Sequence, residues 1–118
     1  MRNTDRIILK KIIGYCDDIN TFLKQFGCSY DVFLSNKLLQ YACNTCVVQI
    51  GELSTRLTEE LKENHKKIPW RIIRATRNYH VHDYENITND VVWQTLTEDI
   101  PELKASLAKI LDEEPMDE

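Results

Sequence analysis

The sequence predicts an all-α protein, a compact antiparallel bundle of four to five helices formed by one domain that spans residues 1–118. Its apolar residues recur every three or four positions, as on one face of a helix, and do not alternate as they do in a strand. Only three Gly and three Pro occur in 118 residues, and 29% of the residues are charged. A chain of this length can build one hydrophobic core and is too short for two.

The first helix is predicted from just after Thr4 to about Gln25. Asp5 lies in its first turn, where a carboxylate interacts favourably with the helix dipole, and Gly27 provides a stop signal. One face is expected to be buried, and its residues are Ile8, Ile12, Tyr15, Cys16, Ile19, Phe22, Leu23 and Phe26. A short turn follows, and its cap comes from Ser29 or Asp31.

The longest helix is predicted from about Ser35 to Asn64, because its apolar residues step by four and three along one stripe. The stripe consists of Leu39, Cys43, Cys46, Ile50, Leu53 and Leu57. Such a heptad-like seam suits either packing within an antiparallel bundle or a dimer interface. Val47 and Val48 lie beside or outside the seam, so burial on two sides predicts a second subunit.

Pro69 suits the first position of a third helix, which Trp70 and Ile73 continue, and both tryptophans of the chain are interpreted as core or interface anchors. A last helix, capped by Asn89 or Asp90, carries Val92, Leu96, Leu103, Leu107 and Ile110. Pro101 must kink or interrupt it, because proline removes one backbone hydrogen bond and clashes with the preceding turn. The acidic tail, about residues 112–118, is expected to fray.

Basic residues are concentrated in residues 62–82, although the whole chain has a net charge of −4. Lys62, Lys66, Lys67, Arg71, Arg74 and Arg77 lie there with Glu63 as the single acid. Such a run is commonly a solvated face, but it adjoins the motif described below, so an electrostatic footprint for nucleic acid is the other interpretation.

The composition predicts a soluble, cytoplasmic protein that does not enter a membrane. No segment approaches the roughly 18 uninterrupted apolar residues that span a bilayer. The four cysteines, Cys16, Cys28, Cys43 and Cys46, are interpreted as free thiols of a reducing compartment, with the last two in the helix seam. No metal site and no cofactor are predicted, because no cluster of ligands accompanies the histidines.

An arginine, an imidazole and a phenol occur close together at Arg77, His82 and Tyr84. In a continuous helix Arg77 and His82 would be about 140° apart around the axis, so a chain bend near Tyr79 is needed to bring them together. Arg74 can share a face with Arg77. This arrangement provides a cation and a titratable base for a phosphodiester. The other interpretation is a hydrogen-bonded helix terminus.

The same residues and their flanks resemble the HepT family of the HEPN superfamily. The resemblance rests on Trp70-Arg71-Ile72-Ile73 leading to Arg77-Asn78, on Val81-His82-Asp83-Tyr84, and on the later patches Val91-Val92-Trp93 and Asp99-Ile100-Pro101-Glu102-Leu103. Ile50-Gly51-Glu52 is similar to another recurring patch of the family. The match covers most of the chain, and the Arg-x4-His-x-Tyr spacing within these flanks is far more specific than an Arg–His pair.

The resemblance implies a HEPN-like bundle that forms homodimers and is the toxin of a toxin–antitoxin module. Arg77 and His82 would then be the catalytic pair of a metal-independent endoribonuclease, with Asn78 as the polar residue beside the arginine. The partner would be an MntA-like nucleotidyltransferase antitoxin that adenylylates Tyr84 using ATP.

One residue departs from the family pattern. His80 is a second histidine, and together with Arg74 it forms a competing Arg-x5-His spacing. It can assist His82, replace it, or point to solvent. His82 is favoured because it alone precedes the Asp-Tyr pair. His65 is interpreted as a surface residue. The alternative function is a non-catalytic binding or regulatory partner of a minimal nucleotidyltransferase.

Overall fold

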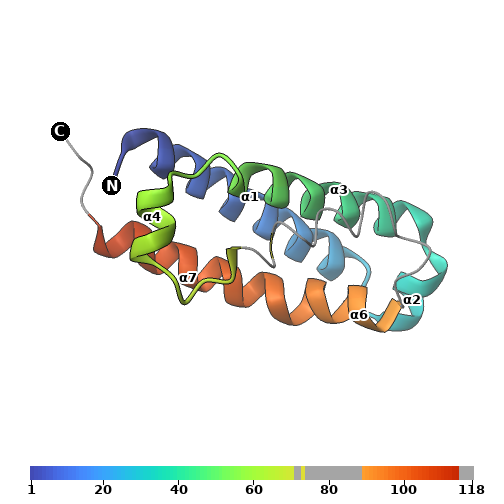
Figure 1. The fold of residues 1–118 in the computed structure, drawn as a ribbon. Coiled ribbons are helices and arrows are strands. Elements are labelled where there is room, and N and C mark those ends of the chain that lie inside the picture. Colours follow the sequence, from blue (N-terminus) through green and yellow to red (C-terminus); the bar gives the residue numbers. More distant parts are fainter. Residues whose placement is uncertain (71–72, 74–88, 115–118) are drawn as a thin grey trace.

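The computed structural model describes residues 1–70, 73 and 89–114, and these residues form helices and connecting turns without any strand. The long helices are α1 (Asn3–Gln25), α3 (Lys37–Ser54) and α7 (Ile100–Glu113). The short helices are α2 (Tyr30–Ser35), α4 (Glu59–Asn64) and α6 (Asn89–Gln94). α1 runs antiparallel to α3 and α7 and packs against both (Figure 1). The predicted all-α antiparallel bundle is confirmed.

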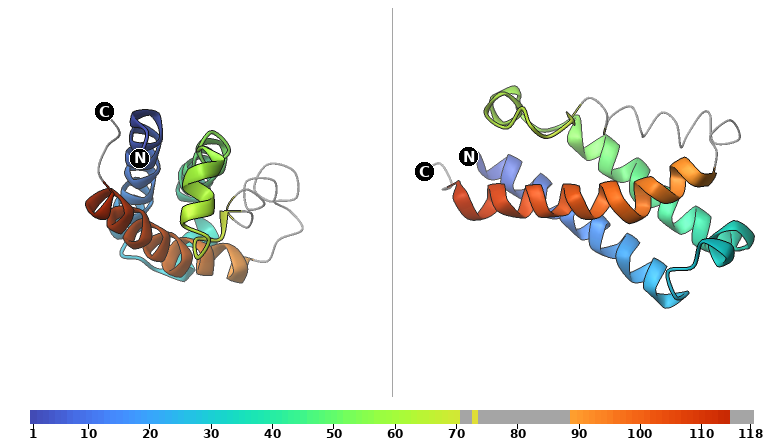
Figure 2. Two further views of the ribbon diagram at one scale, coloured as in Figure 1. Left: turned by 60° about the vertical axis from the view of Figure 1, so that its left-hand side comes forward. Right: turned by 90° about the horizontal axis from the view of Figure 1, so that it is seen from below.

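Figure 2 shows the three long helices packed together, and buried residues from all three contribute to the hydrophobic core. All six residues of the predicted seam are buried: Leu39, Cys43, Cys46, Ile50, Leu53 and Leu57. All five apolar residues predicted on the last helix are buried too: Val92, Leu96, Leu103, Leu107 and Ile110. The seam is therefore used for packing within the bundle, and the dimer-interface interpretation of it is wrong. No described helix is long and apolar enough to cross a bilayer.

Helix α1 ends where the sequence predicts but begins at Asn3, two residues earlier than predicted, and its C-terminus closes in a Schellman motif. The Cys28 N–H donates to the Leu23 carbonyl at 2.7 Å, and the Gly27 N–H donates to the Lys24 carbonyl at 3.0 Å. Gly27 has a φ of +77°, which glycine adopts without steric cost. Where the sequence predicts a short turn, residues 30–35 form helix α2, and of the two proposed caps Ser29 is the one used, because its Oγ accepts the Val32 N–H.

The single helix predicted from Ser35 to Asn64 is wrong, because the chain divides into α3 and α4. Asn36 caps α3 by accepting the Leu39 N–H at 2.9 Å. Thr58, with an extended backbone, caps α4. The Thr58 N–H and hydroxyl donate to the buried Asp5 carboxylate of α1, at 3.0 and 2.6 Å. This contact holds Thr58 outside either helix.

The predicted interruption at Pro101 takes the form of a π-helical turn, η2 (Thr95–Asp99), between α6 and α7. The Ile100 N–H donates to the Thr95 carbonyl, five residues earlier. Pro101 has no N–H to donate, and the wider turn gives its ring room. The prediction that the chain frays from Asp112 onward is wrong for Asp112 and Glu113, because helix α7 continues to Glu113.

Candidate functional site

The residues predicted to form the site lie outside the described residues. They are Arg74, Arg77, Asn78, His80, His82 and Tyr84. Their roles, and the chain bend that would bring Arg77 and His82 together, therefore stay predictions. The structure does describe both flanks of this segment, up to Trp70 together with Ile73 on one side and from Asn89 on the other.

On the near flank, Trp70 fixes the start of the predicted third helix to the bundle. Its indole N–H donates to the His65 carbonyl at 3.2 Å. The Ile73 N–H donates to the Pro69 carbonyl at 3.0 Å, which closes a helical turn beside the proline. Trp70 and Ile73 are half-buried and pack against the core. The prediction that Trp70 is a core anchor is confirmed.

On the far flank, Trp93 fixes α6 to α2. Its ring centroid lies 5.6 Å from that of Tyr30 and 5.4 Å from that of Phe33, both in tilted contacts. The Tyr30 hydroxyl donates to the Asp90 carboxylate, and this hydrogen bond, with burial and the nearby negative charge, raises the pKa of Tyr30 above 10.0. The anchoring role of Trp93 is confirmed. Its two aromatic partners lie far away in the sequence, where no local signal identifies them.

His65 is not the surface residue that the sequence predicts. Its Nε2 lies 3.2 Å from a carboxylate oxygen of Glu114, and the two side chains are only 21% and 27% exposed. Although this distance is short, the two atoms are not aligned for a hydrogen bond, and both are shielded from solvent. The contact joins the end of α4 to the end of α7, so a structural role fits His65.

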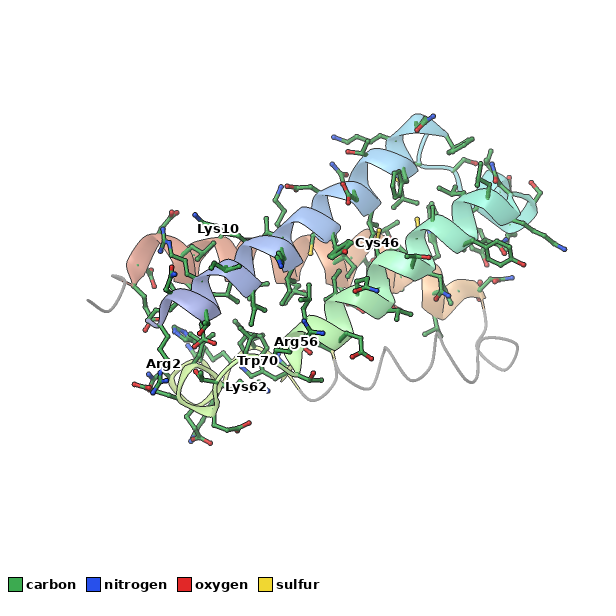
Figure 3. All side chains as sticks on the ribbon, turned by 90° about the horizontal axis from the view of Figure 1, so that it is seen from above. Arg2, Lys10, Cys46, Arg56, Lys62 and Trp70 are labelled. Carbon is green, nitrogen blue, oxygen red and sulfur yellow. The ribbon has the colours of Figure 1, made fainter. Side chains whose placement is uncertain are left out.

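The first part of the basic run is offset by neighbouring carboxylates. Lys62 lies 3.8 Å from Glu59, and Lys66 lies 3.2 Å from Glu63. Figure 3 shows Lys62 on α4, at the same end of the molecule as Trp70. These pairs support the solvated-face interpretation for α4. The arginines of the run, Arg71, Arg74 and Arg77, lie outside the described residues.

A cavity of about 360 Å³ lies between α3, residues 67–69 with Ile73, the π-helical turn and α7. Its apolar walls include Val47, Ile50 and Leu103, and its polar lining includes the carboxylates of Asp99 and Glu102. Burial, and then the charges of Glu98 and Glu102, raise the pKa of Asp99. Lys67 also lines this cavity, so its polar lining carries charges of both signs.

The four cysteines are free, as predicted, and three of them belong to the core. Burial raises the pKa of Cys16 and Cys43 to about 12 and that of Cys46 to about 11. Cys46 lies where α3 faces α1 (Figure 3). These thiols are protonated at neutral pH and are not nucleophiles. Within the described ranges, no three His, Cys, Asp or Glu side chains are placed to hold a metal ion.

Comparison with known proteins defines the class. The model of the family "Ribonuclease HepT-like" matches residues 12–110. A protein of Methanocaldococcus jannaschii named "Putative RNase" is 31% identical over 106 residues, which cover 90% of each chain. A "Putative RNase" of Caldanaerobacter subterraneus is 31% identical over 111 residues, which cover 94% of this chain and 97% of the relative.

A third relative, from Thermococcus cleftensis, is named "Probable ribonuclease HepT". It is 30% identical over 110 residues, which cover 93% of this chain and 98% of the relative. No solved structure matches the chain. Because the family model spans most of the bundle, the chain belongs to the HepT-like family.

Proposed function

We propose that this protein is the toxin of a HepT/MntA-type toxin–antitoxin module and acts as a metal-independent endoribonuclease. The observation that carries the proposal is the Arg77-x4-His82-x-Tyr84 spacing in a chain whose residues 12–110 match the HepT-like family. The RNase names of full-length relatives support the substrate class. The toxin works in the cytoplasm as a homodimer. The fold leaves some large apolar side chains exposed, and these offer a contact surface for the second copy.

The chemistry needs one proton-transfer group and one fixed cation. As the ribose 2′-oxygen bonds to phosphorus, the bond from phosphorus to the 5′-oxygen breaks; one proton leaves the attacking hydroxyl and one reaches the departing oxygen. His82 serves as the proton-transfer group, and Arg77 stabilises the charge that develops on the phosphoryl oxygens. Asn78, Arg74 and His80 are supporting residues that bind and orient the phosphate.

Adenylylation switches the toxin off. The Tyr84 hydroxyl oxygen attacks the α-phosphorus of ATP in the active site of the antitoxin, pyrophosphate leaves, and the hydroxyl proton is lost. The AMP group is bulky and anionic, so it occupies the place of an RNA phosphate beside Arg77 and His82 and repels the substrate. The partner is therefore an MntA-like nucleotidyltransferase, and RNA is the substrate.

Cleavage of RNA by the purified protein in the presence of a chelator tests the nuclease. We expect His82→Ala and Arg77→Ala each to lower the rate by about 10²- to 10⁴-fold. Arg56→Ala and His65→Ala are matched controls, because Arg56 is exposed on the described surface and His65 contacts Glu114. Both controls should cleave RNA normally. If the His82→Ala protein cleaves as fast as the wild type, the assignment is wrong.

Intact mass after incubation with the partner and ATP tests the modification. Each AMP should add about 329 Da, which is the mass of the nucleotide less water. Tyr84→Phe should show no increment, whereas Tyr41→Phe should be modified normally, although the Tyr41 side chain is 63% exposed. A protein that binds the nucleotidyltransferase but cleaves no RNA under any condition would favour the alternative of a non-catalytic partner.

A further inference from the structure

The cavity beside the π-helical turn combines mostly apolar walls with a few hydrogen-bonding groups. Its volume of about 360 Å³ lies within the range of sites for small ligands, roughly 300–1,000 Å³. The apolar side chains that line it are Val47, Ile50, Ile68, Pro69, Ile73, Ile100 and Leu103. The polar ones are Lys67, Thr95, Asp99, Glu102 and Ser106. Such a lining is typical of a site for a small ligand that has an apolar body and polar edges.

Three of the polar residues lie along one face of the helical segment that forms α7. Asp99, Glu102 and Ser106 are spaced by three and four residues, which brings side chains to the same face of a helix. Asp99 occupies the N-cap position of α7, but its side chain makes no capping hydrogen bond, because the π-helical turn continues the helical backbone through this residue. Among the described residues, no donor or cation pairs with the Asp99 carboxylate. This carboxylate is therefore available as an acceptor at the cavity.

Lys67 adds a cation to the same cavity. Lys62 and Lys66 each lie close to a carboxylate of α4, whereas none of the described carboxylates forms an ion pair with Lys67. A ligand that satisfies this lining must therefore present donors to the carboxylates and an acceptor to the ammonium group. The cavity also adjoins the predicted motif in the sequence, because Ile73 lines it and Arg74 is the next residue.

We propose that this cavity holds an unpaired guanine base of the RNA substrate and gives the nuclease a base preference. The inference rests on the proposed function and names the nucleotide that the protein favours. Single-stranded RNA is commonly recognised through unstacked bases whose Watson–Crick edges form hydrogen bonds with the protein. On this edge guanine has two adjacent donors, N1–H and the 2-amino group, and the two oxygens of the Asp99 carboxylate accept both. The neighbouring O6 of guanine accepts from Lys67.

The other bases fit the lining less well. Adenine and cytosine each present one amino group beside a ring nitrogen that is itself an acceptor, and this nitrogen would face a carboxylate oxygen. Uracil has one N–H between two carbonyl oxygens, so the second carboxylate oxygen finds no donor. A bare phosphate is disfavoured too, because the carboxylates of Asp99 and Glu102 outnumber the single ammonium group of Lys67. Guanine is therefore the base whose donors and acceptor match the lining.

Binding of short oligonucleotides, followed by fluorescence anisotropy, tests the cavity without using catalysis. Each probe is a 2′-O-methylated oligouridine with one variable nucleotide at its centre. Such a probe lacks the attacking 2′-hydroxyl and cannot be cleaved, so the wild-type protein can be used. We expect the guanosine probe to bind at least about 10-fold more tightly than the adenosine probe. Inosine, which lacks the 2-amino group, should lie between them. Equal binding of guanosine and adenosine would overturn the inference.

Two variants test the residues, and circular dichroism checks that each one folds. Asp99→Ala removes the acceptor, and Ser106→Leu fills part of the cavity, so each should bring the affinity for guanosine down to that for adenosine. Glu98→Ala is the matched control, because it removes the same charge one residue earlier from an exposed side chain outside the lining. It should strengthen the binding of every probe about equally and keep the guanosine preference. If Asp99→Ala keeps the preference as well, the cavity is not the cause.

Competition by guanosine monophosphate tests whether the base belongs to RNA. We expect the free nucleotide to bind at least about 10-fold more weakly than the guanosine probe, since the flanking nucleotides add contacts. Equal affinity would assign the cavity to a free nucleotide and overturn the RNA base as its occupant. RNA cleavage is measured separately. A guanosine preference without cleavage supports the cavity and overturns the nuclease, whereas cleavage without the preference supports the nuclease and overturns the cavity.

Discussion

Replacing Asp5 by Ala should destabilise the fold strongly, although the residue lies only in the first turn of α1. Its carboxylate is 2% exposed and accepts both the backbone N–H and the hydroxyl of Thr58. The Thr58 Oγ1 in turn accepts the Leu61 N–H, at 3.3 Å, and so caps α4. One side chain thus joins the start of α1, the turn after α3 and the start of α4.

The magnitude follows from these contacts. A hydrogen bond to a charged group contributes about 1.5–3 kcal/mol, and two such bonds are lost in Asp5→Ala. Thr58 is half-buried, so water can partly replace the lost acceptor, and the lower value applies to each bond. We therefore expect the free energy of unfolding to fall by about 3 kcal/mol. Asp5→Asn keeps an acceptor oxygen, so it should cost about half as much.

Urea denaturation followed by far-UV circular dichroism measures this change. Asp18→Ala is the control, since Asp18 is an exposed acid of the same helix, and it should change stability by less than about 0.5 kcal/mol. A double-mutant cycle with Thr58→Ala isolates the coupling between the two residues. The reasoning is refuted if Asp5→Ala costs no more than the control, or if the effects of Asp5→Ala and Thr58→Ala simply add.

Three further predictions use the thiols, a tyrosine and a tryptophan. In the native protein at about pH 8, a thiol reagent should modify Cys28 alone, and after unfolding it should modify all four thiols. The pKa of Cys16 is raised from 9.0 to about 12 by folding, so the Cys16 thiol ionises first in the unfolded chain. The free energy of unfolding should therefore fall as pH rises from 9.0 to about 12. By NMR titration, Tyr30 should ionise above 10.0, and Asp90→Asn should lower its pKa; an unchanged value would remove the hydrogen bond as the cause. Because the Trp93 ring contacts Tyr30 and Phe33, adding single-stranded RNA to a Trp70→Phe protein, in which Trp93 is the remaining tryptophan, should not quench its fluorescence; quenching would indicate a base-stacking surface.

The sequence predicts those parts of the fold whose causes are local. The C-terminal end of α1 follows from Gly27, whose positive φ closes the Schellman motif, whereas its start at Asn3 carries no side-chain cap and lies two residues before the predicted one. Pro101 predicts an interruption because its missing N–H acts within one turn of the chain. The form of the interruption, a π-helical turn, depends on how α6 and α7 pack on the core, and no local pattern specifies it.

Features that depend on contacts with residues far away in the sequence cannot be predicted from local sequence patterns. The apolar spacing continues without a break from Leu39 to Leu57, and so it predicts one helix where the structure has α3, a turn and α4. The break is held by Asp5, 53 residues before Thr58 in the sequence. The Arg77, His82 and Tyr84 motif rests on residue types and spacing and stays a prediction. Its flanks are anchored at Trp70 and Trp93, as the sequence predicts. The contact of the partly exposed His65 with Glu114 had no local signal.

Leu38 and Leu39 of α3 show most clearly what spacing can and cannot decide. Leu38 and Leu39 are the same residue type and neighbours in the sequence, yet Leu38 is 74% exposed and Leu39 is 2% exposed. The difference arises because α1 covers one side of α3, and this is a long-range fact. Leu39→Asp places a carboxylate in the core and should cost more than about 3 kcal/mol, enough to unfold a marginal domain. Leu38→Asp should change the stability of the monomer by less than about 0.5 kcal/mol. Urea denaturation at a concentration where the wild type is monomeric compares the two, and equal losses would show that the outer side of α3 is covered within the chain.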